Sequence, residues 1–166
     1  MLSKLIRSLL VVPILVALGT VAAAADTTGT GNNMTLTVPS SAKLIARVAV
    51  PVTIQIQCTG GIDTSTFYYL QGPYYNSNAS VTISQASGRT VNSASGSVNQ
   101  AIQCDGLSHS YSVSVLASAP LRTGQAAITS SATWFESVYG CSYVLGCGYF
   151  SSQASASAQG PLALSG

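Results

Sequence analysis

Charged side chains are scarce in this sequence. They make up 6% of its 166 residues, with six Lys and Arg against four Asp and Glu. Lys4 and Arg7 lie near the N-terminus, so the rest of the chain carries four basic and four acidic residues and is close to neutral. A nucleic-acid-binding surface needs clustered Lys and Arg that displace counterions, and here the basic residues are scattered. We therefore expect no nucleic acid among the partners.

Groups that perform acid–base chemistry are equally few, because the chain has one histidine, His109, and four carboxylates. Asp105 and His109 lie close together in the sequence, and with one of the many serines they could form a hydrolytic triad. Asp105-Gly106 is, however, typical of a turn that leads into a strand, with His109 at the entrance of that strand. We expect a protein that is not an enzyme, and a hydrolase using His109 is the weaker alternative.

Long apolar runs are absent after residue 25. Before it, Lys4 and Arg7 precede an uncharged apolar stretch at residues 9–21 and then four alanines, which is the pattern of a secretory signal peptide. The stretch is shorter than the about 20 residues that span a bilayer. We expect residues 1–25 to be a cleaved signal peptide, residues 26–33 a disordered N-terminus and residues 34–166 a single domain. This domain is expected to have no membrane span and to be secreted, either extracellular or at the cell surface.

The four cysteines are Cys58, Cys104, Cys141 and Cys147, an even number in a chain expected to be exported. Disulfides are therefore favoured over metal ligands, and three pairings can be drawn. We favour Cys58 with Cys104, because each ends an alternating apolar strand, and Cys141 with Cys147, because they flank a short loop. A zinc site usually needs paired short spacings and histidine. We expect no metal and no cofactor.

Helical periodicity is missing after the signal peptide, and the dominant period is two. It is clearest before Cys58, where apolar residues occupy every second position from Val48 onward. Turn signals such as Gly60-Gly61 and Gly72-Pro73 separate the expected strands. These strands cover residues 34–38, 47–58, 80–85, 97–104, 110–116, 125–133 and 151–164. The pattern predicts an all-β fold, an immunoglobulin-like Greek-key β-sandwich of about seven strands with two disulfides, with a jelly roll or small barrel as the alternative.

Several strand motifs carry a family resemblance that covers about residues 43–133. They are Val52-Thr53-Ile54-Gln55-Ile56-Gln57-Cys58, Val81-Thr82-Ile83-Ser84-Gln85, Gln103-Cys104-Asp105-Gly106, Tyr111-Ser112-Val113-Ser114-Val115 and Gly124-Gln125-Ala126. With them the chain resembles secreted β-sandwich proteins of uncharacterised function from actinobacteria and related bacteria, which implies compartment and fold. A weaker resemblance, carried by the short loop between Cys141 and Cys147, is to neocarzinostatin-type antibiotic carrier proteins, which are also small exported sandwiches.

Aromatic residues are unevenly distributed, since eleven of the twelve lie in two segments, residues 67–75 and 134–150. Valine, isoleucine, leucine and alanine already supply the inward face of the strands, so we expect many of these rings in loops or at sheet edges. If the two loops meet, they form a recognition surface, because Tyr and Trp give a large contact area at a low entropic cost. A satellite cluster over the open end of the sandwich is the alternative. The expected ligand-binding residues are Tyr68, Tyr69, Tyr74, Tyr75, Trp134, Tyr139 and Tyr143.

The sequence thus predicts a secreted, non-enzymatic binding or surface protein. Its aromatic-rich loops would contact a glycan, a small apolar ligand or a surface protein partner. The second hypothesis is a structural protein that self-assembles at the cell surface, because the alternating Ser and Ala of residues 151–159 suit a flat edge strand that pairs with another copy.

Overall fold

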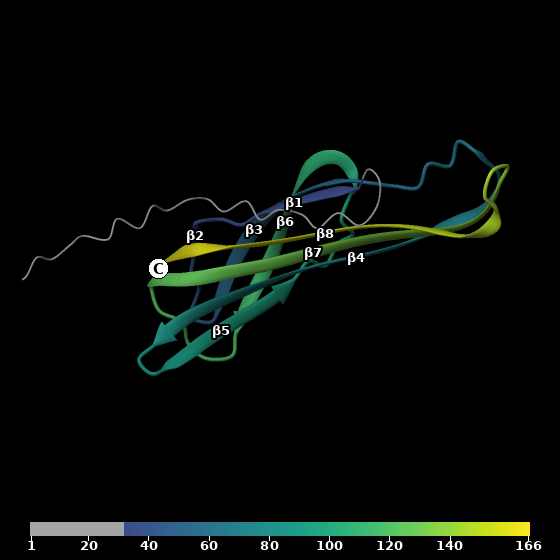
Figure 1. Ribbon diagram of the computed structural model, residues 1–166. Coiled ribbons are helices and arrows are strands. Elements are labelled where there is room, and N and C mark those ends of the chain that lie inside the picture. The colour runs from purple at the N-terminus through teal and green to yellow at the C-terminus, as the bar shows by residue number, and fades with distance from the viewer. Residues whose placement is uncertain (1–31) are drawn as a thin grey trace, which may run out of the picture.

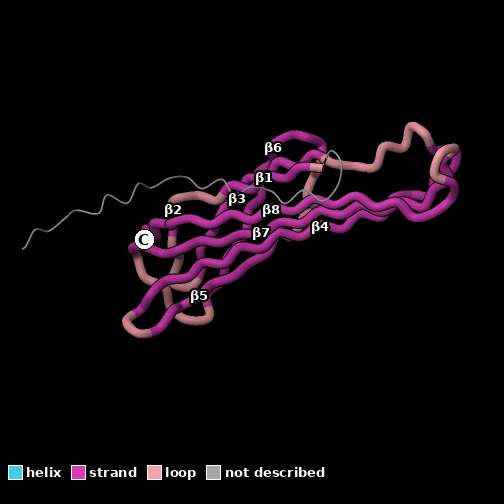
Figure 2. The backbone as a smooth tube through the Cα atoms, in the orientation of Figure 1, coloured by secondary structure: helices cyan, strands magenta, loops and turns pink. Residues whose placement is uncertain are grey.

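The computed structural model describes residues 32–166, and this part of the chain is all-β (Figure 2). Within it, no helix is available that could span a membrane. The expected signal peptide and most of the expected N-terminal tail lie outside the described residues, whereas Asn33 already begins a strand. The eight strands are β1 (Asn33–Thr37), β2 (Ser41–Lys43), β3 (Ala49–Thr59), β4 (Phe67–Ser87), β5 (Thr90–Ser97), β6 (Asp105–Ala117), β7 (Gly124–Ser142) and β8 (Gly146–Ser165).

All eight strands belong to one curled sheet in the order β1-β3-β6-β5-β4-β7-β8-β2. The curl brings β8 back towards β1, where the Asn32 side chain donates hydrogen bonds to Ser152 Oγ at 2.6 Å and to the Gln153 carbonyl at 3.2 Å. The sequence did not predict two of the eight strands, β2, which pairs with the end of β8, and β5. The three residues of β2 are too few to show an alternating pattern, and β5 is mostly polar.

The core lies inside the curl and follows the predicted alternation. On β3, every second side chain from Val50 to Cys58 is buried, while the residues between them are exposed. On β8, Ala154, Ala156 and Ala158 are buried in the same way, so the Ser/Ala stretch is a core strand. Burial of apolar side chains on alternating positions is the main stabilising contribution of such a sheet.

The strand expected at residues 97–104 is wrong. Apart from Ser97, the last residue of β5, these residues form an irregular connection between β5 and β6. Its backbone is bound outside the ladder, because Ile102 N–H donates to Ser77 Oγ at 2.9 Å and Gln103 N–H donates to the Tyr111 hydroxyl at 2.8 Å. Hydrogen bonds to side chains thus replace strand pairing although the apolar residues alternate.

Three strands are much longer than expected. We expected residues 80–85, 125–133 and 151–164, whereas β4, β7 and β8 contain 21, 19 and 20 residues. Their additional residues continue beyond the body of the sheet as a narrow three-stranded extension (Figure 1). We call residues 67–78, 134–142 and 146–153 the arm.

Both favoured disulfide pairings are confirmed. Cys58 at the end of β3 is joined to Cys104 just before β6, with 46 residues of separation, and Cys141 is joined to Cys147 across the β7–β8 hairpin, with a separation of 6. The first bridge ties the irregular 98–104 connection to the core strand β3. The second closes the end of the arm. Two disulfides are typical of proteins from an oxidising compartment.

The two disulfides should contribute unequally to stability. Loop-closure entropy predicts that replacing both Cys58 and Cys104 by Ala lowers the free energy of unfolding by about 4 kcal/mol, against about 2 kcal/mol for Cys141 and Cys147. Denaturant titration of the two double variants, with the wild type as reference, measures this difference. A larger loss of unfolding free energy in the Cys141/Cys147 variant would contradict the prediction that the Cys58–Cys104 disulfide contributes more to stability.

Candidate functional site

The two aromatic segments lie side by side in the arm. We expected loops or sheet edges, and both segments are mainly strands, of which residues 67–78 of β4 lie at a sheet edge. Tyr74 of β4 pairs with Ser137 of β7, and Tyr139 of β7 pairs with Tyr149 of β8. Aromatic residues favour extended backbone, so continuing the strands is the local preference of both segments. The rings therefore belong to a projecting sheet and do not fold over the open end of the body.

The arm has two faces because side chains on a strand alternate. Register places Tyr74 on one face and its neighbour Tyr75 on the other, opposite Glu136. We call the Tyr74 side the outer face; it carries Tyr69, Gln71, Tyr74, Asn76, Phe135, Ser137, Tyr139, Tyr149, Ser151 and Gln153. We call the other side the inner face; it carries Tyr75, Ser77, Trp134, Glu136, Val138 and Phe150.

The outer face is aromatic, exposed and free of charged side chains. Tyr74 is 61% exposed and Tyr149 is 81% exposed. The rings of Tyr139 and Tyr149 contact each other edge to face, with centroids 5.1 Å apart. Around them is a shallow hollow of about 410 Å³, which Gln71, Gly72, Phe135 and Ser137 also line. The face can stack on a ring and offer neutral hydrogen-bonding groups beside it.

The inner face is covered by the connection from β3 to β4, residues 60–66. Glu136 Oε2 accepts a hydrogen bond from Ile62 N–H at 3.0 Å, and the Thr66 carbonyl accepts one from Tyr143 N–H at 3.4 Å. Trp134 and Val138 are buried beneath this segment. A small sheet needs one apolar face packed against another part of the chain, and residues 60–66 meet this need.

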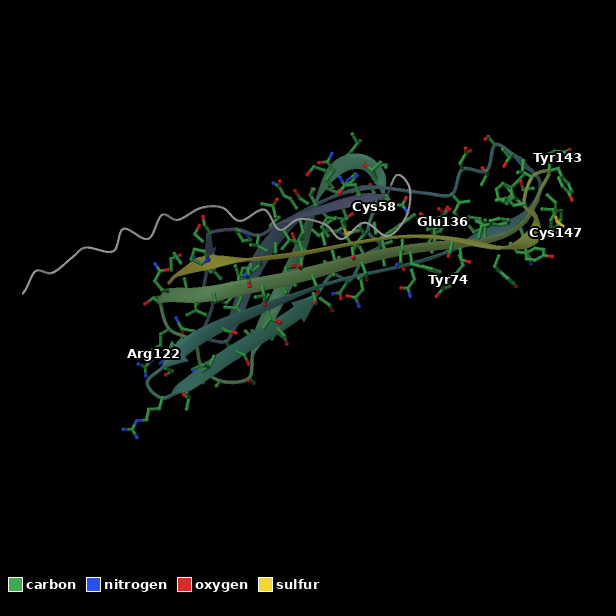
Figure 3. The ribbon with its side chains drawn as sticks, viewed as in Figure 1. Cys58, Tyr74, Arg122, Glu136, Tyr143 and Cys147 are labelled. Carbon is green, nitrogen blue, oxygen red and sulfur yellow. A yellow bond between two sulfur atoms is a disulfide. The ribbon has the colours of Figure 1, made fainter. Side chains whose placement is uncertain are left out.

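The tip of the arm is a turn of three exposed apolar residues, Tyr143, Val144 and Leu145. The ring of Tyr143 contacts that of Tyr68 in a tilted arrangement, with centroids 4.6 Å apart, and the Cys141–Cys147 disulfide lies beside them. Figure 3 shows Tyr143 and Cys147 at the far end of the arm, away from Cys58. The disulfide lowers the entropic cost of presenting this turn in one shape.

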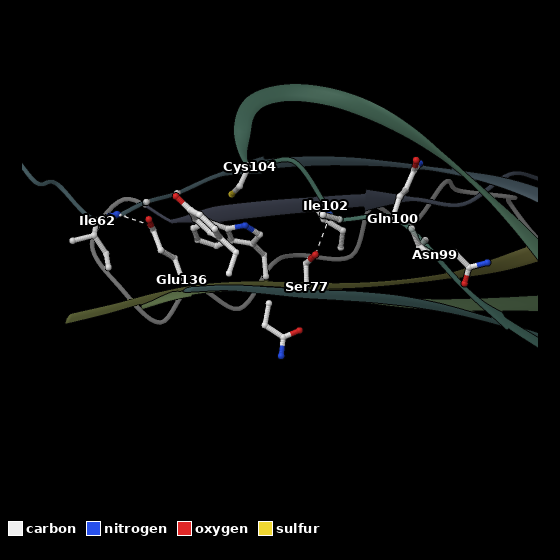
Figure 4. Close-up of a pocket in the computed structure, with 14 residues that line it drawn as sticks. Ile62, Ser77, Asn99, Gln100, Ile102, Cys104 and Glu136 are labelled. Atoms are coloured by element: carbon white, nitrogen blue, oxygen red, sulfur yellow. Dashed lines mark hydrogen bonds between the residues drawn. The ribbon is translucent and has the colours of Figure 1, made fainter. Parts of the chain in front are cut away.

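A cleft of about 720 Å³ lies where the arm leaves the body, a volume typical of small-molecule sites. Its floor is the inner face, with Tyr75, Trp134 and Glu136, and its walls are residues 60–62 and 98–104 (Figure 4). The second wall is held to β4 by two hydrogen bonds, from Val98 N–H to the Ala79 carbonyl and from Ile102 N–H to Ser77 Oγ. Desolvation and the neighbouring Glu136 carboxylate raise the pKa of the Tyr75 hydroxyl.

Charges are separated along the molecule although they nearly cancel in number. Asp63, Asp105 and Glu136 lie at the arm or at its base, where β3 ends and β6 begins. The basic residues of the described chain lie at the opposite end, as Figure 3 shows for Arg122. At that end, the Arg47 side chain donates a hydrogen bond to the Leu121 carbonyl, and the Arg122 carbonyl accepts one from the Gln85 side chain. Lys43 lies opposite Ser165 in the pairing of β2 with β8, and Arg89 is in the turn between β4 and β5.

The seven expected site residues are divided among three places. Tyr69, Tyr74 and Tyr139 are on the outer face, Tyr75 and Trp134 are on the inner face, and Tyr68 and Tyr143 are at the tip. We did not select Tyr149 or Glu136. The sequence could have indicated Tyr149 as a site residue, because a disulfide between Cys141 and Cys147 in a hairpin places residue 149 opposite the selected Tyr139.

The Asp105 and His109 side chains do interact, with Asp105 Oδ1 2.8 Å from His109 Nε2. The turn interpretation holds as well, because Asp105 Oδ1 also accepts Leu107 N–H at 2.9 Å and Gly106 has a φ of 85°. The hydrogen bond from His109, followed by that from Leu107, lowers the pKa of the exposed Asp105 carboxyl. In residues 32–166 no serine hydroxyl is hydrogen-bonded to His109, and no group of three metal-ligating side chains occurs.

Comparison with known proteins returned no matching family model, curated protein or solved structure. The two family resemblances drawn from the sequence therefore stay predictions.

Two glycines opposite each other in the arm test its packing. A Cβ on Gly140 would lie 2.5 Å from Phe67 Cδ1 and 3.0 Å from the Tyr69 carbonyl oxygen, whereas a Cβ on Gly148 would meet nothing within 4 Å. We expect Gly140→Ala to lower the free energy of unfolding by about 1–3 kcal/mol through overpacking. The arm amides should also exchange faster in hydrogen-exchange measurements. Gly148→Ala is the matched control, and equal effects of both variants would contradict this packing.

Proposed function

We propose that this chain is a secreted binding protein whose outer face binds an uncharged glycan. The observation that carries the proposal is the gathering of Tyr74, Tyr139 and Tyr149 on one exposed face without a charged side chain. Tyrosine rings can lie against the apolar face of a sugar ring, and their hydroxyls can reach sugar hydroxyls. Gln71, Ser137 and Ser151 add neutral donors and acceptors on the same face.

The arrangement favours a chain-like glycan over a small enclosed ligand. The hollow around Tyr74 and Tyr149 is open, and the rings are distributed over three neighbouring strands. The covered inner face supports the arm from behind, so the outer face is presented with little ordering cost on binding. A sheet surface also holds side chains more rigidly than loops do.

The compartment and the finer fold belong to the same proposal. Two disulfides support an oxidising, extracellular location. The sheet order supports an immunoglobulin-like sandwich, because β1-β3-β6-β5 and β4-β7-β8 correspond in chain order to strands ABED and CFG. The Cys58–Cys104 disulfide is unlike that of antibody domains, since it joins β3 to the residues before β6 and leaves β7 out.

Retention on insoluble polysaccharides tests the glycan proposal. We expect the protein to co-sediment with at least one of cellulose, chitin and an insoluble α-glucan, and Tyr74→Ala or Tyr149→Ala to weaken binding about tenfold, or about 1.4 kcal/mol. Val91→Ala, which changes an exposed residue of β5 outside the arm, is the control. Absence of retention on every polysaccharide, or equal retention of all variants, would refute the proposal.

Self-assembly is the second candidate function, and the free edge of the arm favours it. On the side away from β7, β4 pairs with β5 only from Ser80 to Ser87 and the Ala79 carbonyl accepts Val98 N–H, so residues 67–78 have no strand partner there among the described residues. An uncharged free edge of this length can pair with another chain.

Light scattering between dilute and concentrated solution tests this second function. Assembly through the β4 edge predicts a mass that rises with concentration. The exposed Asn78, at the end of this edge next to the body, offers a blocking substitution: Asn78→Lys should keep the protein monomeric, because a charge there opposes edge pairing. A wild-type protein that is monomeric at every concentration would exclude this function.

A further inference from the structure

The cleft at the base of the arm holds a buried carboxylate with no cation near it. Glu136 is 8% exposed and lines the cleft. Within residues 32–166 the only ion pair is that of Asp105 with His109, so Glu136 has no charged partner in the part of the chain described. A buried carboxylate is costly unless hydrogen bonds and an opposite charge compensate it.

The basic end of the molecule is too far away to supply that charge. Glu136 is twelve residues along β7 from Gly124, where the basic end begins, which corresponds to about 40 Å of extended strand. Charges are largely screened beyond about 8 Å at physiological ionic strength. Asp63 and Asp105 lie at the same end of the molecule as Glu136 but do not line the cleft, so Glu136 is the one charged group in its lining.

Two aromatic rings lie on the floor of the cleft beside this carboxylate. The centroids of Tyr75 and Trp134 are 6.4 Å apart and their planes are tilted by 39°. A cation interacts favourably with a ring face within about 6 Å of its centroid. Trp134 is 6% exposed and Tyr75 is 58% exposed, so the ring face that a cation can reach is that of Tyr75, with Trp134 packed behind it.

The other end of the cleft is polar and neutral. Figure 4 shows Glu136 and Ile62 at one end and Asn99 and Gln100 at the other, with Ser77 and Ile102 between them. The Asn99 and Gln100 side chains are exposed amides that can donate and accept hydrogen bonds.

We propose that this cleft binds a small organic cation. Its alkylammonium group lies against Glu136 and over the exposed ring of Tyr75, and a hydroxyl or carbonyl group on its tail reaches Asn99 and Gln100. The site is on the inner side of the arm, so the proposal does not depend on glycan binding at the outer face.

Glu136 also has a structural role, and the test must separate the two. Its Oε2 accepts the Ile62 N–H and holds residues 60–66 over the arm. Glu136→Gln keeps a side-chain carbonyl that can accept this hydrogen bond and removes only the charge. An unchanged melting temperature with lost cation binding therefore identifies the charge itself as the binding element.

Choline is the probe, and 3,3-dimethyl-1-butanol is its uncharged isostere. Trp134 is the one tryptophan of the chain, so its fluorescence reports on the cleft alone. We expect choline to change this fluorescence saturably and the isostere to bind at least about tenfold more weakly. Isothermal titration with choline provides the second measurement.

Three variants locate the interaction. We expect Glu136→Gln to weaken choline binding about tenfold or more and Tyr75→Leu, which removes an exposed ring, to weaken it several-fold. Asp63→Asn is the matched control, because it removes an exposed carboxylate of the 60–66 segment that does not line the cleft. Its choline affinity should stay within about twofold of the wild type.

Several results would overturn the proposal. They are no saturable response of the wild type to choline, equal binding of the uncharged isostere, or an effect of Asp63→Asn as large as that of Glu136→Gln. If the protein binds choline, co-sedimentation with phosphatidylcholine vesicles tests whether the cation belongs to a lipid. Co-sedimentation that free choline competes away assigns the cation to a lipid headgroup, and its absence assigns it to a soluble molecule.

Discussion

The arm depends on one constraint: a three-stranded sheet that leaves the protein body must bury one of its faces. Residues 60–66 satisfy it, held by the hydrogen bonds from Ile62 N–H to Glu136 and from Tyr143 N–H to the Thr66 carbonyl. Because this segment covers the inner face, the outer face stays free and rigid. Because the segment starts at the end of β3, a cleft remains between it and the 98–104 connection. Both candidate sites thus follow from how one side of the arm is covered.

Charge separation gives the molecule two different ends in spite of its near neutrality. Among residues 32–166, the acidic residues lie at the arm or its base, and the basic residues lie at the opposite end, as Figure 3 shows for Glu136 and Arg122. Along strands of about 20 residues, the two ends are several Debye lengths apart at physiological salt. Each end therefore acts on a partner nearly independently, and the charge balance read from composition hides this. The proposed ligands fit this division, since the outer face has no charged side chain and the lining of the cleft has the Glu136 carboxylate.

Local patterns in the sequence were sufficient for the core and the disulfides. The alternating pattern predicted β3. The position of Cys58 and Cys104 at expected strand ends predicted the first disulfide, and the short loop between Cys141 and Cys147 predicted the second. Alternation failed at residues 97–104, because side-chain hydrogen bonds from Ser77 and Tyr111 replace the ladder there. It also failed at β5, where Ala94 is the one buried residue of a mostly polar strand. The continuation of β4, β7 and β8 into the arm agrees with the preference of aromatic residues for extended backbone, but the coverage of its inner face by residues 60–66 is a long-range contact that no local pattern encodes.

The division of the site into two faces follows from the period of a strand. Tyr74 and Tyr75 are neighbours in sequence, yet one lies on an exposed neutral face and the other beside a buried carboxylate. Clustering in the sequence therefore predicts that rings are close in space but not that they share a partner. β7 repeats the division, since Phe135 faces outward while Trp134 and Glu136 face the cleft. The same backbone therefore presents two chemically different faces, and each needs its own variants to test what it binds.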